Sequence, residues 1–260
     1  MNITIASTSN QGERMSNQDQ IGAVIGNRSA CFVVCDGIAG LPGGEIAAKV
    51  ARDTILRNFD GEKHMDAQSI RQYISQANQA IQRQQQQSAQ YSKMGTTLVS
   101  LFVDRDYQLA YWAHAGDSRL YLFRRGYLHA ITRDHSLVQQ MADAGYQTSG
   151  INSNLLYFAL GLNEDRDASY GDVLQLEDGD VFLLCTDGFW HNFTHNELEQ
   201  ALHMVNSPGE WLSLLQQAWD KNGQGASSDN YSAIAVWIGS PQETTLLHSL
   251  ADAERFLSHN

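Results

Sequence analysis

The chain has 260 residues, 42% of them hydrophobic, and its formal net charge is -12. This length can bury a substantial core, and we expect one large domain because no linker-like stretch divides the chain. The acidic balance argues against nonspecific binding to nucleic acid or to anionic membranes, since such binding depends on Lys and Arg.

The N-terminal segment MNITIASTSN shows neither a basic leader nor a long apolar run. No window approaches the roughly 20 apolar residues that a membrane-spanning helix needs. The cysteines Cys31, Cys35 and Cys185 lie in or beside apolar runs, which is typical of small buried hydrophobes in a reducing compartment. We therefore expect a cytoplasmic protein. A monomer is also expected.

The first part of the chain predicts three strands followed by two helices. The strands are expected at 2–9, 21–26 and 29–35. The third alternates too little to be half exposed, which indicates a strand covered on both faces. Helices are expected at 43–59 and 66–88, because apolar residues recur there near the helical period. In the first helix these residues are Ile46, Val50, Ala51, Ile55, Leu56 and Phe59. In the second they are Ile70, Tyr73, Ile74, Ala77 and Ile81.

The second part is richer in strands. In chain order it predicts strands at 96–103, 108–114 and 119–124, a helix at 134–144, an irregular segment at 145–170, strands at 172–176 and 180–185, helices at 196–205 and 208–221, a strand at 231–238 and a helix at 244–257. The long irregular segment is typical of a functional flap. Runs of strands separate from paired helices favour an α+β layered sandwich over a doubly wound sheet.

Acidic residues lie at the ends of three of these strands. CFVVCDGIAG carries Asp36 just after an apolar run, and VFLLCTDG does the same with Asp187. Asp229 instead comes just before the run 231–238. If these are neighbouring strands of one sheet, with the third antiparallel to the others, the carboxylates converge at one edge. Convergent carboxylates suggest a site for a divalent metal ion.

An ordered set of short motifs resembles the metal-dependent type 2C (PPM family) Ser/Thr protein phosphatases, in their small stand-alone bacterial form. Each motif alone is a weak signal, but seven in the right order over residues 12 to 238 are specific. The motifs are Arg14-x-x-Asn17-Gln18-Asp19, Val34-Cys-Asp-Gly-Ile-Ala-Gly40 with Gly44-Glu45-Ile-Ala-Ala48, Met94-Gly-Thr-Thr97, Ala115-Gly-Asp-Ser-Arg119, Thr132-x-Asp134-His-Ser136, Cys185-Thr-Asp-Gly188 and Asp229-Asn230.

The resemblance implies a four-layer αββα sandwich with two central antiparallel sheets flanked by helix pairs. It assigns residues 1–240 to the catalytic domain and leaves 241–260 as a C-terminal tail with a short helix. It also implies two Mn²⁺ or Mg²⁺ ions at one edge of the sandwich, where a bridging water attacks phosphorus without a phosphoenzyme. Hard cations of this kind prefer oxygen ligands and keep several waters when few carboxylates bind them.

By resemblance, Asp36 bridges both ions and the Gly37 carbonyl contacts one of them, directly or through water. Asp187 and Asp229 hold the other ion. Glycine at position 37 lets the backbone approach the metal. Asp117 matches an aspartate associated with a third metal position in bacterial members, and an ordinary hairpin-turn aspartate is an equal alternative.

Three further residues are expected around the metals. Asp19 orients metal-bound water, and Arg14 resembles the residue that clamps the substrate phosphate through its planar guanidinium. A surface salt bridge is the alternative for Arg14. Gln18 stands where many members have glutamate, so an acidic contact is replaced by an amide oxygen that still accepts from metal-bound water.

Ile38 is the most serious departure from the family pattern. Many members have histidine there, which is proposed to protonate the leaving oxygen, and isoleucine cannot donate a proton. Metal-bound water or another histidine must then serve. His191 is nearest in sequence, although a capping or surface role fits it better. His114 and His135 are expected to be structural.

Three functions are compatible with the sequence. The first is hydrolysis of phosphoserine and phosphothreonine on a protein substrate, opposing a bacterial eukaryotic-type Ser/Thr kinase, with type VI secretion among the pathways that use such pairs. The second is dephosphorylation of an anti-sigma-factor antagonist in a partner-switching pathway. The third is a noncatalytic interaction module of the same fold. Retention of Asp36, Asp187 and Asp229 favours catalysis.

Overall fold

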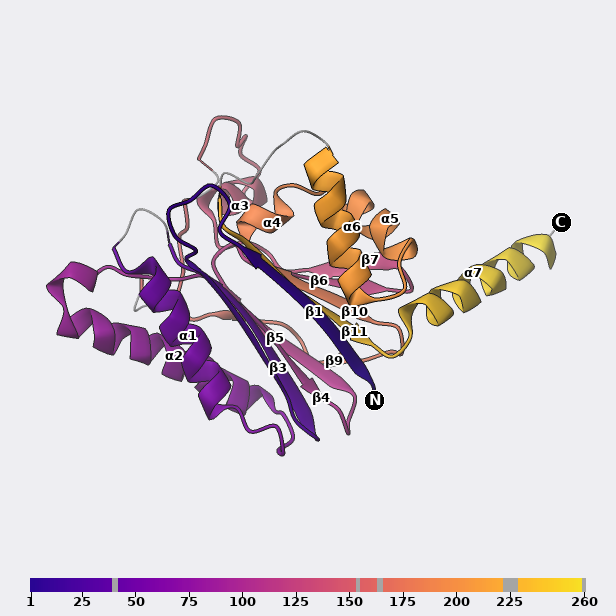
Figure 1. Cartoon of the computed structure of the whole chain (residues 1–260), viewed down its shortest axis with the longest axis horizontal. Coiled ribbons are helices and arrows are strands. Elements are labelled where there is room, and N and C mark those ends of the chain that lie inside the picture. The colour runs from indigo at the N-terminus through magenta and orange to yellow at the C-terminus, as the bar shows by residue number, and fades with distance from the viewer. Residues whose placement is uncertain (39–41, 153–154, 163–165, 222–228, 259–260) are drawn as a thin grey trace.

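The computed structural model describes residues 1–38, 42–152, 155–162, 166–221 and 229–258. Two antiparallel sheets face each other, with helices on both outer faces (Figure 1). This arrangement confirms the predicted four-layer αββα sandwich. Residues 39–41, which include the end of the Val34–Gly40 motif, and parts of the predicted flap, 153–154 and 163–165, lie outside the described ranges.

Each sheet has its own strands. The five-stranded sheet consists, in spatial order, of β1 (Ile3–Asn10), β11 (Tyr231–Ile238), β10 (Val181–Cys185), β6 (Arg119–Arg124) and β7 (Tyr127–Ile131). The six-stranded sheet has the order β2 (Asp19–Ile25), β3 (Ser29–Asp36), β4 (Leu98–Asp104), β5 (Leu109–Ala115) and β8 (Ser169–Tyr170), and β9 (Leu174–Gln175) also pairs with β5. β3 is therefore not in the same sheet as β10 and β11, and the predicted single-sheet arrangement is wrong.

The helices cover the outer faces in pairs. α1 (Gly44–Asn58) and α2 (Ala67–Gln87) lie on the six-stranded sheet, whereas α5 (His195–His203) and α6 (Pro208–Lys221) lie on the five-stranded sheet (Figure 1). The remaining helices are η1 (Ala89–Tyr91), α3 (Leu137–Asp143), α4 (Asp187–Trp190) and α7 (Pro241–Ser258). The elements η1, α4 and β8 were not predicted, because each is too short to show a periodic pattern. The strand β7 was not predicted either, since His129 interrupts its short apolar run.

Three apolar layers hold the sandwich together: one between the sheets and one under each helix pair. Every residue of β3 before Asp36 is buried, as the sequence predicted. The buried face of α1 consists of Ala47, Ala48, Ala51 and Ile55 besides Gly44, whereas the predicted Ile46 and Val50 are only half-buried. Small side chains on this face let the helix pack closely on the sheet.

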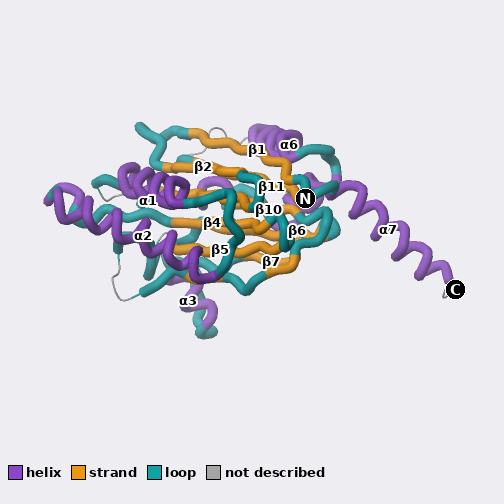
Figure 2. The backbone as a smooth tube through the Cα atoms, turned by 90° about the horizontal axis from the view of Figure 1, so that it is seen from below, coloured by secondary structure: helices purple, strands orange, loops and turns teal. Residues whose placement is uncertain are grey.

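The C-terminal helix α7 extends away from the sandwich (Figures 1 and 2). It begins at Pro241, three residues before the predicted start, because proline suits the first helical position. Its 18 residues exceed the short helix expected for the tail. Over the described ranges, no helix has the length and hydrophobicity that crossing a membrane would need. The domain boundary at residue 240 stays a prediction.

Candidate active site

Strand ends from both sheets bring the predicted acidic residues together. Asp36 ends β3 of the six-stranded sheet. Asp187 begins α4 directly after β10, and Asp229 precedes β11 in the other sheet. Because the two sheets are stacked, these chain ends meet across the sandwich and not along one sheet edge. All three carboxylates line one cavity.

The cavity has a volume of about 150 Å³. Its described lining residues are Arg14, Gln18, Asp36, Gly37, Ile38, Thr97, Asp117, Leu156, Asp187, Asp229 and Asn230. The lining thus combines four carboxylates with one guanidinium and a small apolar part. Of the predicted site residues, Asp19 alone is not part of the lining.

Gly37 lies where the chain leaves β3 and passes close to α1. A Cβ atom at this position would come within 2.3 Å of the Gly44 backbone, so only glycine fits. The Gly37 N–H donates to the Gln18 carbonyl at 3.2 Å, and Gly37 forms a bridge with Thr96. These contacts fix the backbone of Gly37 at the cavity. The need for glycine comes from the contact with α1, whereas the approach of this backbone to a metal stays a prediction.

Hydroxyl groups from the two residues before β4 and from the turn before β6 hold Asp36. The Asp36 N–H donates to Thr97 Oγ1 at 3.0 Å, and this hydroxyl is 2.7 Å from Ser118 Oγ. The Thr96 hydroxyl donates to the Asp36 carbonyl at 2.8 Å. The sequence motif contained Thr96 and Thr97, but only the structure shows that they set the position of Asp36.

Arg14 and Asp229 form an ion pair, with 2.7 Å between Nη2 and Oδ2. Asn230 holds the loop that carries Arg14, because its amide donates to the carbonyls of Gln11 and Ser16, and its Oδ1 accepts from the Gln18 N–H. Sequence reasoning placed Asn230 in a motif without a role. Its three contacts identify it as the residue that orients this loop.

Burial and mutual repulsion disfavour the charged forms of the carboxylates. Burial raises the pKa of Asp36 well above its usual range, and the charges of Asp19, Asp187, Asp117 and Asp229 raise it further. The pKa of Asp187 rises because of burial and then the charge of Asp229. Burial, followed by the charge of Asp187, raises the pKa of Asp117 to about 8. A cation would relieve this repulsion.

The donor set fits hard divalent cations. Every polar side chain that lines the cavity, apart from Arg14, offers oxygen, and the buried Oδ1 of Asp187 has no hydrogen-bond partner. Among the described residues, no three His, Cys, Asp or Glu side chains close around a single point. Hard divalent cations prefer oxygen ligands such as those that line this cavity.

Asp19 lies beside Asp36 but behind the cavity lining. The two residues face each other across the β2–β3 pair. Asp19 Oδ2 accepts from the Thr186 hydroxyl at 3.0 Å, whereas its buried Oδ1 has no partner. Burial raises the pKa of Asp19 to about 6. Its position is consistent with the expected contact to water at the site.

Asp117 lies in the turn between β5 and β6, which belong to different sheets. The turn is therefore a crossover between sheets, and the alternative of an ordinary hairpin-turn aspartate is wrong. Gly116 adopts φ +93°, and a Cβ there would lie 2.8 Å from the Thr97 side chain. The tight turn places the buried Asp117 at the cavity.

The apolar part of the lining comes from Ile38 and Leu156. Leu156 belongs to the predicted flap, and the apolar run at 155–160 is the sequence feature that could have indicated its place in the lining.

His191 is exposed, its Nδ1 lies 3.0 Å from the Asp187 carbonyl, and it is not among the lining residues. His114 and His135 are buried and stacked on each other, as expected of structural residues.

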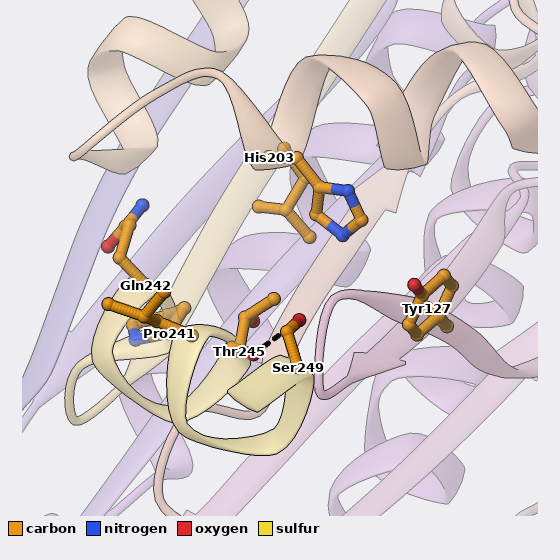
Figure 3. Close-up of a pocket in the computed structure, with 8 residues that line it drawn as sticks. Tyr127, His203, Pro241, Gln242, Thr245 and Ser249 are labelled. Atoms are coloured by element: carbon orange, nitrogen blue, oxygen red, sulfur yellow. Dashed lines mark hydrogen bonds between the residues drawn. The ribbon is translucent and has the colours of Figure 1, made fainter. Parts of the chain in front are cut away.

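A separate pocket of about 400 Å³ lies beside the start of α7 (Figure 3). Its lining includes Tyr127, His203, Gln242 and Leu246. Among its described lining residues, His203 is the only histidine and none is a carboxylate. This pocket lacks the paired groups that catalysis requires, so the acidic cavity is the candidate active site.

Known proteins resemble this chain over most of its length. A family profile described as Protein phosphatase 2C matches residues 7–224. Protein phosphatase PhpP of Streptococcus pneumoniae is 30% identical over 201 residues, which cover 73% of this chain and 80% of that protein. The predicted resemblance is therefore confirmed at the level of the family.

Solved structures show the same fold. The catalytic domain of the serine threonine protein phosphatase PstP, in complex with two manganese ions, superposes with a TM-score of 0.78 at 25% identity and covers 92% of this chain and 99% of that one. PppA of Pseudomonas aeruginosa, described as a key regulatory component of its type VI secretion system, gives a TM-score of 0.75 at 28% identity and covers 91% of this chain and 97% of that one. The chain belongs to the protein phosphatase 2C family of serine/threonine protein phosphatases.

Proposed function

We propose that the acidic cavity hydrolyses phosphoserine and phosphothreonine on a protein substrate with the help of two Mn²⁺ or Mg²⁺ ions. One observation carries this proposal: Asp36, Asp187 and Asp229 converge beside Arg14 in a single cavity. When bound, the two cations supply an activated water and stabilise the negative charge of an in-line displacement at phosphorus. The PstP structure, which contains two manganese ions, supports this choice of metal.

Each of the predicted metal-site residues then has a role. Asp36 and the Gly37 carbonyl would hold the metal pair on the side of β3, and Asp187 and Asp229 would hold it on the side of β10 and β11. Asp117 would hold a third ion. Gln18 and Asp19 would orient water molecules, because each offers an oxygen that accepts hydrogen bonds.

Arg14 would bind the phosphate of the substrate. In the structure one guanidinium nitrogen donates to Asp229. A guanidinium has five N–H donors in a planar fork, so the remaining donors can contact phosphate oxygens. Neither histidine nor lysine is among the described lining residues. We infer that water protonates the leaving serine or threonine oxygen, since Ile38 cannot.

The chain would oppose a Ser/Thr kinase that phosphorylates the same substrate. Its likeness to PppA makes type VI secretion the first pathway to examine. The decisive experiment measures phosphate release from a phosphothreonine peptide by EDTA-treated protein, with and without added Mn²⁺, with a phosphotyrosine peptide as control. We expect release from the phosphothreonine peptide that depends on Mn²⁺. Absence of such release would overturn the proposed function.

A further inference from the structure

Trp190 connects two carboxylates of the cavity that belong to different segments. It is the last residue of α4, whose first residue is Asp187. Its indole Nε1 donates to the backbone carbonyl of Asp117 at 2.9 Å. Trp190 itself is not part of the cavity lining. The indole therefore ties the crossover turn that carries Asp117 to the short helix that carries Asp187.

The indole ring is itself held in place. The Arg119 guanidinium carbon lies 3.3 Å from the centre of the Trp190 ring. Two hydrogen bonds of 2.8 Å each join Arg119 to the two carboxylate oxygens of Asp134. The Arg119 and Asp134 side chains are only 18% and 9% exposed, so water competes weakly for this pair. The ring cannot turn away from Asp117 without disturbing these contacts.

The other side of the crossover turn is fixed independently. Ser118 contacts the Thr97 hydroxyl, which accepts from the Asp36 N–H. The turn thus relates Asp117 to Asp36 through hydroxyl groups and to Asp187 through the indole. Removal of the indole N–H would release only the second of these connections.

We propose that Trp190 is a positioning residue that fixes the spacing between Asp117 and Asp187 and thereby increases the affinity of this side of the cavity for a divalent cation. This inference rests on the proposed function, because it requires cations at these carboxylates. The tether joins the turn that carries Asp117 to the helix that carries Asp187. Without it, the turn and the helix are free to move apart in the metal-free protein, and an arriving cation must bring the two side chains to the right spacing at a cost in affinity.

The test uses Trp190→Phe, which retains an aromatic ring beneath Arg119 but removes the N–H donor. Calorimetric titration of the EDTA-treated protein with Mn²⁺ measures affinity without reference to activity. We expect the affinity of at least one Mn²⁺ site to fall about five-fold, which is the effect of one lost hydrogen bond. Turnover at saturating Mn²⁺ should stay close to that of the natural chain, since saturating metal restores the spacing.

Trp211→Phe is the matched control. The indole of Trp211 donates to the Leu198 carbonyl at 3.2 Å, and the residue is fully buried under the helices of the five-stranded sheet. The substitution removes the same type of hydrogen bond away from the cavity. We expect it to lower the melting temperature while Mn²⁺ affinity is retained. An equal loss of Mn²⁺ affinity in both variants would overturn the positioning role.

Unchanged Mn²⁺ affinity in folded Trp190→Phe would also overturn the proposal. If that variant does not fold, Asp134→Asn decides, because it loosens Arg119 and keeps the indole. Weaker Mn²⁺ binding by Asp134→Asn would then support the proposal, and unchanged binding would overturn it. If the natural chain binds no Mn²⁺ at all, the proposed function fails first, which distinguishes that failure from a failure of the role of Trp190.

Discussion

Arg14 Nη2 lies 2.7 Å from Asp229 Oδ2, so the proposed phosphate-binding residue is directly paired with a proposed metal ligand. The two side chains remain 46% and 34% exposed, which leaves both accessible to ligands. A cation at Asp229 would compete with the guanidinium for the carboxylate and free its donors for phosphate. We therefore expect metal binding and substrate binding to be coupled through this pair.

Arg14→Ala should raise KM for a phosphopeptide and leave kcat nearly unchanged. The charge-assisted contact to phosphate exists in both the ground state and the transition state, and its loss costs on the order of 1.5–3 kcal/mol, or roughly ten- to hundred-fold in KM. Mn²⁺ should bind somewhat more tightly, because Asp229 loses its competing partner. Steady-state kinetics and Mn²⁺ titration check both effects. A collapse of kcat at constant KM would instead make Arg14 a residue that acts in the transition state.

Asp36→Asn should abolish activity and leave the fold intact. The amide keeps the volume of the side chain but removes the central negative charge of the proposed metal site. Because the folded environment raises the pKa of Asp36, its ionised form opposes folding at neutral pH. In EDTA the variant should therefore melt at a higher temperature than the natural chain, and added Mn²⁺ should stabilise it less. Turnover near that of the natural chain at saturating Mn²⁺ would remove Asp36 from the site.

Asp229→Ala should lose activity that high Mn²⁺ concentrations partly restore. The carboxylate is proposed to contact only one ion, so its removal weakens metal binding without eliminating it. An activity titration with Mn²⁺ measures the recovery, and Asp36→Asn, which should show none, is the comparison. Activity that is absent at every Mn²⁺ concentration would indicate that Asp229 has a more central role.

The acidic site could be predicted because each aspartate adjoins a buried apolar run. Which strands are neighbours could not be predicted, because an apolar run indicates that a strand is buried but not which strand it pairs with. β3 pairs with β2 and β4, and its Asp36 reaches Asp187 only across the stacked sheets. The pairing of strands that are distant in sequence decides which sheet carries Asp36, and this pairing is set by tertiary packing.

Single contacts between distant residues were also beyond sequence reasoning. The Trp190 indole and the Asp117 carbonyl are 73 positions apart, and a four-residue helix shows no periodic pattern. Leu156 lies in an irregular segment, where neither helical nor strand alternation indicates which way a side chain points. The motifs located the charged residues, whereas the groups that position them required the structure.

Stability should depend on pH through His135. Its ring is stacked on that of His114, with centroids 4.5 Å apart, and its Nδ1 accepts from the Gly116 N–H. Burial, followed by the charges of His114 and Arg166, lowers the pKa of His135 to about 4. The unfolded chain, with a pKa near 6.5, therefore binds more protons between these values, and stability is lost as pH falls through this window.

The expected loss for His135 is at most about 3 kcal/mol. His135→Asn retains an acceptor for the Gly116 N–H but does not titrate. The melting temperatures of the natural chain and of this variant are measured in EDTA between pH 7 and pH 4.5. As pH falls, we expect the melting temperature of the natural chain to decrease more than that of the variant. The comparison cancels the titration of the carboxylates that both proteins share. Equal pH dependence in the two proteins would show that His135 does not contribute.

The missing acid at position 38 gives the last prediction. Ile38 is half-buried, lines the cavity, and donates its backbone N–H to the Gly95 carbonyl at 3.1 Å. Ile38→His would place a proton donor in this lining. The rate should rise for phosphoserine and phosphothreonine peptides, whose alkoxide leaving groups need a proton. It should hardly change for p-nitrophenyl phosphate, because its phenolate leaves without help.

The alternative is that Ile38 serves chiefly to pack against α1. Histidine would then destabilise the fold and slow both substrates together. Ile38→Ala is the control, because it removes the same packing without adding a donor. A gain confined to the peptide substrates, at an unchanged melting temperature, supports water as the acid of the natural enzyme. General-acid assistance affects only the substrate with the basic leaving group. An equal loss of rate on both substrates, together with a melting temperature as low as that of Ile38→Ala, would therefore show that Ile38 is a packing residue.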